Sequence, residues 1–225
     1  MVPSPLRCLV HAASGAAAQA LPAGFGRGAR PDRRILRETA MSEPEPTNDP
    51  PPETPLEGGC DCRRVRYRLA SAPLVVHCCH CRWCQRETGS AFALNAMIES
   101  ERVTLLGEAP ELVHTPSASG RGQDIARCPS CRVAVWSHYA GGGPLISFVR
   151  VGTLDEPDRL PPDIHIFTAS KQPWVVIPAG ARAVPEYYRS EEVWSAASLE
   201  RRRAVAPRLE AWRAARRAAE GGAAG

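Results

Sequence analysis

Residues 78–84 read Cys-Cys-His-Cys-Arg-Trp-Cys, and this dense run of thiols is the feature from which the fold can be deduced. Neighbouring thiolates on a turn can reach one metal ion at about 2.3 Å. A metal held by three protein groups keeps a fourth position for water or substrate, as catalytic zinc sites do. The three cysteines with this spacing are Cys79, Cys81 and Cys84.

Two residues next to this cluster leave the number of its metal ligands undecided. Either Cys78 or His80 could supply a fourth ligand, and the site would then be closed and structural. Because His80 lies between two ligands in the chain, we expect its side chain to point away from the metal and to be an ordinary surface or hydrogen-bonding histidine.

Two cysteine pairs flank the cluster, Cys60-x-Cys62 before it and Cys128-x-x-Cys131 after it. The glycines of Gly58-Gly59 permit the tight backbone that a metal knuckle requires. If the pairs combine, four thiolates form a closed tetrahedral zinc site that clamps the start of the domain to its middle. We therefore predict two zinc ions, one structural and one with an open position.

Other uses of cysteine fit less well. A disulfide framework needs a secretory context and usually an even number of cysteines, whereas this chain has nine. A thioredoxin-like redox pair needs a βαβ setting, and the surroundings here predict strands joined by turns. No role is assigned to Cys8 or Cys78.

Short apolar segments around the cysteines predict a mainly β fold. In residues 64–69 the apolar side chains fall on every second position, which is the period of a half-buried strand. Many short strands with brief connections favour a β-sheet fold over βαβ units. Further strands are expected at 74–76, 103–106, 111–113, 133–136, 145–149 and 164–167.

Helix is expected mainly after residue 189. Ser190 is suited to be an N-cap with acidic residues in the first turn, which predicts a helix to about Ala206. Pro207 should interrupt it. A second helix rich in Ala and Arg should follow over 208–220 and end at two glycines.

These patterns divide the chain into three parts. Residues 1–55 are expected to be a disordered leader, because 41–55 hold six prolines and almost no apolar side chains. Residues 1–40 suggest an upstream extension from a mis-assigned initiation codon, with a secretory or organelle-targeting peptide as alternatives. A zinc-binding domain should span 56–188, and a basic helical tail 189–225.

Charge and hydropathy argue against several partners. The net charge is +4, and the excess lies at the ends, where arginine runs are expected to be solvated surface. The tail lacks the interleaved aromatic residues of a single-strand binder, so nucleic acid is not expected. No stretch approaches the roughly 18 to 20 apolar residues of a membrane span, so we expect a soluble, cytoplasmic protein without a membrane partner.

In the order and spacing of these motifs, residues 56–188 resemble the glutathione-dependent formaldehyde-activating enzyme family, also called the centromere protein V family. The matching motifs are Gly58-Gly59-Cys60-x-Cys62, Cys79-His80-Cys81-x-x-Cys84, Thr88-Gly89-Ser90-Ala91-Phe92, Cys128-x-x-Cys131, His165-Ile166-Phe167 and Ser170-Lys171-x-x-Trp174.

The resemblance implies an Mss4-like fold of several coiled β-sheets with zinc knuckles, to which this chain adds its helical extension. It also implies a structural zinc on the two outer cysteine pairs and a second zinc on the inner three. The family's founding activity is addition of glutathione to formaldehyde, giving S-hydroxymethylglutathione, which is a carbon–sulfur lyase reaction in the reverse sense. This chain departs from the family pattern at Arg132, where a glycine is common, and at the added thiol Cys78.

Substrate contacts are predicted from the chemistry of nearby residues. Arg86 and Ser90 should lie near the open zinc, where a guanidinium could pair with a substrate carboxylate. Lys171 should line the same cleft. Trp174, in an apolar run, is expected in the core, and His165 is expected to be exposed because it alternates with two isoleucines.

Two functions from different classes remain. The first is a zinc-dependent carbon–sulfur lyase that acts on a small-molecule thiol or aldehyde substrate. The second is a non-catalytic zinc module that binds protein or nucleic acid through its basic ends. The open three-cysteine site favours the enzyme.

Overall fold

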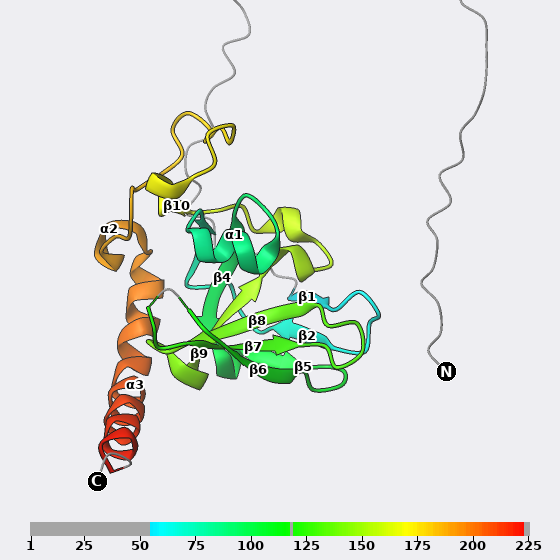
Figure 1. Ribbon diagram of the computed structural model, residues 1–225, viewed down its shortest axis with the longest axis vertical. Helices are drawn as coiled ribbons and strands as arrows, with labels where there is room; N and C mark the ends of the chain where they lie inside the picture. The colour runs from blue at the N-terminus through cyan, green and yellow to red at the C-terminus, as the bar shows by residue number, and fades with distance from the viewer. Residues whose placement is uncertain (1–54, 118, 223–225) are drawn as a thin grey trace, which may run out of the picture. The chain divides into compact units, whose positions relative to one another are not determined.

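The computed structural model describes residues 55–117 and 119–222, and Figure 1 shows the strands of this region with a long helix beside them. The expectations for the leader and for Cys8 lie outside the described residues. A smaller antiparallel sheet has the order β1-β2-β5, formed by β1 (Leu56–Gly59), β2 (Arg66–Leu69) and β5 (Val103–Leu105).

The larger sheet has seven strands in the order β10-β3-β4-β9-β8-β7-β6. Its pairings are antiparallel except for the parallel pair β10–β3. The mainly β prediction is therefore confirmed. The strands are β3 (Val75–Cys79), β4 (Ala93–Glu99), β6 (Glu111–Thr115), β7 (Gln123–Arg127), β8 (Ala134–Tyr139), β9 (Ile146–Arg150) and β10 (Ile164–Ile166).

Three strands were not predicted from the sequence: the edge strand β1 of the smaller sheet and the inner strands β4 and β7 of the larger sheet. The sequences of β4 and β7, Ala-Leu-Asn-Ala-Met-Ile-Glu and Gln-Asp-Ile-Ala-Arg, contain few β-branched or aromatic residues. Strand preference depends strongly on packing against neighbouring strands, and in these two segments pairing on both sides outweighs local composition.

The two faces of the larger sheet carry different cores. Along β3 and β4, Val76 and Ala96 belong to a first core that also contains Tyr67 of the smaller sheet. Val75 and Ala93 belong to a second core on the other face. Alternation along each strand therefore separates the two cores.

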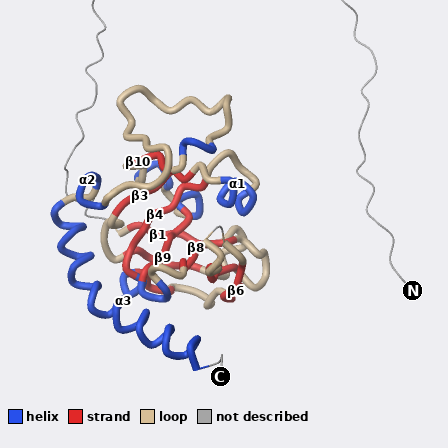
Figure 2. The backbone as a smooth tube through the Cα atoms, turned by 60° about the vertical axis from the view of Figure 1, so that its left-hand side comes forward, coloured by secondary structure: helices blue, strands red, loops and turns tan. Residues whose placement is uncertain are grey.

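Three α-helices are present in the described region: α1 (Arg82–Thr88), α2 (Ser190–Val193) and α3 (Ala196–Gly222). The predicted interruption at Pro207 is wrong, because α3 continues through it. A proline inside a helix removes one hydrogen bond. Packing offsets this loss, since Val205 and Leu209, on either side of the proline, lie in or against the second core. Figure 2 shows α3 curving beside the sheet.

Arginines of α3 form ion pairs with the rest of the domain. The sequence had predicted that the arginine side chains of this tail are solvated. Arg201 forms an ion pair with the buried Glu99 through Nε and Nη2. Its third nitrogen, Nη1, donates to the carbonyl of Ala72 at 2.8 Å. Arg208 pairs with Glu101 near the same strand end. The basic character of the tail is thus partly neutralised by acidic groups on the sheet.

Single-turn 3₁₀ helices connect several strands: η2 (Ser100–Arg102), η3 (Gly143–Leu145), η4 (Val151–Thr153), η5 (Pro157–Arg159) and η6 (Thr168–Ser170). Within the described chain, no helix combines the length and apolar character needed to cross a membrane.

Candidate metal centres and an adjoining cavity

The two outer cysteine pairs meet in space as the sequence predicted. The sulfurs of Cys60, Cys62, Cys128 and Cys131 all lie within 4.8 Å of one another. Cys62 Sγ lies 3.5 Å from Cys60 Sγ and 3.6 Å from Cys128 Sγ. Four thiols at these separations form a donor set of the kind that holds a tetrahedral zinc ion.

The two knuckles share one backbone pattern. Cys60 N donates to the carbonyl of Val65 at 3.0 Å, and Cys128 N donates to that of Val133, also five residues on, at 2.9 Å. After each pair the chain passes through a left-handed residue, Arg63 or Arg132, both with φ of 62°. Glycine adopts this conformation at little cost, which explains why glycine is favoured where this chain has Arg132.

The three inner cysteines form a second cluster at the end of β3 and the start of α1. The sulfurs of Cys79, Cys81 and Cys84 lie within 4.8 Å of one another. Cys81 is the N-cap of α1, and its sulfur accepts a hydrogen bond from Cys84 N at 3.3 Å. The strand end and the first helical turn therefore bring the three thiols together.

Electrostatics shows that this cluster suits a cation. Hydrogen bonds with the thiols of Cys79 and Cys84 lower the pKa of Cys81. The pKa of Cys79 is raised by its hydrogen bonds with Cys81 and Cys84. Three thiols this close cannot all ionise alone, because like charges repel. A soft cation such as zinc at the centre removes the repulsion, and sulfur ligands select such metals. The donor set therefore fits zinc.

A cavity of about 300 Å³ adjoins the three-cysteine cluster, and all three cysteines line it. Its wall comes from strands β3, β4, β8, β9 and β10, from α1, and from the segments after β6 and β10. The remaining lining residues are His77, Trp83, Asn95, Ser117, Ser119, Tyr139, Phe148, Ile166, Phe167 and Tyr187.

His77 is a site residue that the sequence reasoning missed. Its Nε2 lies 2.5 Å from the hydroxyl of Tyr188, which accepts a hydrogen bond from Trp194 Nε1 at 2.9 Å. We assign the Tyr188 proton to the hydrogen bond with His77 Nε2, which puts the ring proton of His77 on Nδ1. Burial lowers the pKa of His77 to about 4, so its ring is neutral at pH 7. Its position two residues before Cys79, on the same face of the strand, was the available signal.

A buried guanidinium lies behind the same wall. Arg150 is 8% exposed, and it donates to Asn95 Oδ1 at 2.7 Å and to Ser137 Oγ at 3.3 Å. No carboxylate of the described residues forms an ion pair with it. Arg150 lies close enough to Cys84 and Tyr139 for its charge to act on both. This positive charge favours thiolates at the cluster.

Cys78 and His80 point to the opposite side of β3 from the three-cysteine cluster. His80 Nε2 lies 3.5 Å from Cys78 Sγ and 3.0 Å from His165 Nδ1, so these three form a separate buried group. The hydrogen-bonding role expected for His80 is thus present, but the side chain is buried. The expected exposure of His165 is wrong. Its ring is 9% exposed, because β10 pairs with β3 on one side and Ala183 bridges it on the other.

The predicted substrate residues Arg86, Ser90 and Lys171 are not among the residues that line the cavity. Arg86 and Ser90 are exposed, on α1 and just after it. Lys171 Nζ donates to the carbonyls of Gln172 and Val175, at 3.2 and 2.6 Å. Val175 N donates to the carbonyl of Gln172 at 3.1 Å and closes a turn that contains Trp174. Trp174 is 73% exposed, so its predicted burial is wrong.

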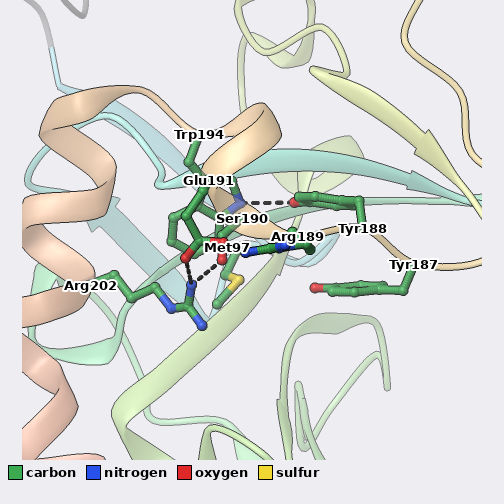
Figure 3. A pocket seen from close by; sticks show the side chains of 8 residues that line it. All are labelled: Met97, Tyr187, Tyr188, Arg189, Ser190, Glu191, Trp194 and Arg202. Carbon is green, nitrogen blue, oxygen red and sulfur yellow. Dashed lines mark hydrogen bonds and ion pairs between the residues drawn. The ribbon is translucent and has the colours of Figure 1, made fainter.

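A second hollow of about 270 Å³ lies beside the first, and Tyr187 borders both. Figure 3 shows Arg202 of α3 reaching Ser190 and Glu191 of α2, with Trp194 bonded to Tyr188 nearby. The guanidinium of Arg202 also lies 5.5 Å from the centre of the Trp194 ring. These contacts connect the C-terminal helices to the residues that hold His77.

Comparisons with known proteins identify the family of this chain. The model of the glutathione-dependent formaldehyde-activating enzyme family matches residues 55–170, which is more than half of the chain. A protein of Halomonas elongata, described provisionally as such an enzyme, is 25% identical over 126 residues, covering 54% of this chain and 80% of its own. A crystal structure of a Rhodobacter sphaeroides protein aligns with 44% of this chain and 87% of its own, at 17% identity and a TM-score of 0.33. On the extent of the family match, this chain belongs to the glutathione-dependent formaldehyde-activating enzyme family.

Proposed function

We propose that this protein is a zinc-dependent carbon–sulfur lyase that forms or cleaves a thiol–aldehyde adduct such as S-hydroxymethylglutathione. The observation that supports it best is a cluster of three cysteines, and not four, in the wall of a cavity large enough for a small ligand. The family match supports the same reaction class.

Two zinc ions are proposed, with unequal tasks. Cys60, Cys62, Cys128 and Cys131 would hold a structural ion, and the inner three cysteines a reactive one. When bound by three thiolates, zinc can polarise a carbonyl and favour the thiolate form of a thiol.

Side chains of this protein would bind and orient the substrate. His77 holds a proton on Nδ1 at the cavity wall, where it can donate to an oxygen of the adduct. Arg86 follows Trp83 by three residues on α1 and so shares its side of the helix, near the cavity mouth. We propose that it pairs with a carboxylate of the thiol, with Ser90 and Lys171 as further polar contacts near the same mouth.

A panel of small thiols with formaldehyde tests this function. The zinc-loaded protein should accelerate adduct formation or its reversal, measured by exchange spectroscopy, and Cys81→Ser should abolish the acceleration. Cys78→Ala, which removes a thiol outside the three-cysteine cluster, should retain it. If no thiol in the panel reacts faster than without protein, the proposed enzyme function is rejected for these substrates. A non-catalytic zinc module that binds a macromolecule then becomes the better explanation.

A further inference from the structure

The wall of the cavity beside the three cysteines is largely apolar and aromatic. Among the described residues that line it there is no Lys, Arg, Asp or Glu. Its polar groups besides the thiols are uncharged: one imidazole, one amide, the indole N–H of Trp83, and the hydroxyls of two serines and two tyrosines. The apolar part of the wall consists of Trp83, Tyr139, Phe148, Ile166, Phe167 and Tyr187.

This wall matches neither component of the founding reaction. Formaldehyde has one carbon and would leave most of about 300 Å³ to water against aromatic rings. Glutathione has two carboxylates and an ammonium group, and a charge moved into an apolar cavity without a partner loses its hydration. A charged tail is better accommodated outside, near Arg86.

We propose that the aldehyde half of the substrate has an apolar substituent about the size of a phenyl ring, and that this group occupies the cavity. This inference rests on the proposed lyase function and names its substrate class. In the addition, the thiol sulfur forms a bond to the aldehyde carbon, the carbonyl π bond breaks, and its oxygen takes the proton that the thiol loses. Cleavage reverses these changes, so no oxidant or reductant is needed.

A second feature of the wall supports an oxygen-bearing ligand. The indole Nε1 of Trp83 is buried, and no described residue accepts a hydrogen bond from it. Buried donors without partners are uncommon and call for an explanation. Because Trp83 lines the cavity, we infer that an oxygen on the bound adduct accepts this hydrogen bond.

The kinetic test compares two aldehydes with the same thiol. The zinc-loaded protein, glutathione and either formaldehyde or phenylacetaldehyde are mixed, and exchange is followed by NMR. For each aldehyde the ratio of the catalysed to the uncatalysed rate is measured. We expect this ratio to be at least tenfold larger for phenylacetaldehyde than for formaldehyde, because the ring is buried in the cavity.

The binding test does not depend on turnover. The unreactive alcohol 2-phenylethanol should bind and change the tryptophan fluorescence, whereas ethanol at equal concentration should not. Tyr187→Ser should weaken this binding several-fold, and its fold should survive because Tyr187 is 55% exposed. Leu112→Ala, a change at an exposed apolar side chain of β6 outside the cavity, is the matched control. Trp83→Phe keeps a ring in the wall and removes the donor, so it should weaken binding less than Tyr187→Ser.

The outcomes separate the two proposals. If formaldehyde is accelerated as well as phenylacetaldehyde and 2-phenylethanol does not bind, the inference is overturned and the lyase function stands. If 2-phenylethanol binds in a Tyr187-dependent way but no aldehyde is accelerated, the lyase function fails and the cavity is still a ring-binding site.

Discussion

The two cysteine clusters lie in different cores, and this difference bears on the separate roles that we propose for them. Cys60 and Cys128 belong to the first core, between the two sheets. Cys79 and Cys84 belong to the second core, which Trp194 and Val205 of the C-terminal segment help to fill. The first cluster joins residues about seventy positions apart, whereas the second is local and borders a cavity.

A metal bound by distant ligands contributes to folding, because it closes a long loop that the unfolded chain leaves open. A metal bound by a local cluster closes almost no loop. We therefore expect that the second core, with its cavity, can lose its metal without general unfolding. Four pairs of variants test this division, from the largest expected effect to the smallest.

Serine substitution in each cluster should give the largest contrast. Cys128→Ser should unfold or aggregate the protein, because structural zinc in small modules contributes on the order of 10 kcal/mol. Cys81→Ser should remove one zinc and leave a cooperative unfolding transition. Metal analysis and thermal unfolding provide the two readouts, and equal effects of the two substitutions would refute the division into structural and reactive sites.

Removal of the buried ion pair should weaken the second core selectively. Arg201→Ala leaves the carboxylate of Glu99 buried, and loss of one partner of a buried pair costs about 3–5 kcal/mol. We expect the lower end, because Arg102 lies 3.4 Å from the same carboxylate. Arg203→Ala, at an exposed position on the same helix, is the control. Denaturant unfolding and metal content test this, and loss of zinc from the four-cysteine cluster first would contradict it.

The same pair predicts how stability depends on pH. Burial is the largest single influence and raises the pKa of Glu99, but hydrogen bonds from Arg201 and the backbone, together with the charges of Arg201 and Arg102, outweigh it and hold the pKa below its usual value. A lowered folded-state pKa stabilises the fold above the unfolded pKa of about 4.3, and this contribution is lost as pH falls through the folded value. The stability difference between the wild type and Arg201→Ala should therefore shrink in acid. A difference that grows below pH 4 would exclude this ion pair as its source.

A glycine under α3 offers a test of how closely the helix packs on the sheet. Gly143 has φ of 52°, and an added Cβ would lie 2.5 Å from the Trp212 ring. Gly143→Ala should therefore destabilise the protein by about 1–3 kcal/mol through overpacking. Gly141→Ala meets no atom within 4 Å and should change the melting temperature little. If the two variants have the same melting temperature, α3 does not pack closely against this turn.

The smallest effect is expected at the turn of the first knuckle. Arg63 is left-handed, so Arg63→Gly should relieve strain and stabilise the protein by up to about 1 kcal/mol. Arg64→Gly, next to it and outside the left-handed region, should destabilise by about 0.5–1 kcal/mol through added chain entropy. Matched melting curves measure both, and a stability loss at Arg63→Gly would mean that its side chain contributes more than its backbone strain costs.

The cysteine spacing predicted that each local group of thiols converges, because cysteines two or three residues apart on a turn lie close together. It left open whether the two outer pairs combine, and the fold brings their four sulfurs within 4.8 Å of one another. Strands with clear alternation, such as β2, were also predicted. The sequence did not reveal β4, whose alanines and asparagine have little strand preference of their own. It also did not reveal His77, because its partner Tyr188 lies 111 positions away.

The sequence by itself determined where thiols gather along the chain and hence the prediction of metal sites, since local thiol spacing needs no tertiary contact. Only the tertiary structure decided what surrounds each cluster. The apolar cavity arises where β3, β4 and α1 meet aromatic side chains from distant segments. The packing of the basic tail on the domain also depends on the tertiary structure, because Arg201 of α3 pairs with the buried carboxylate of Glu99 on β4. Such pairings depend on sheet order and register, which follow from the packing of the whole domain.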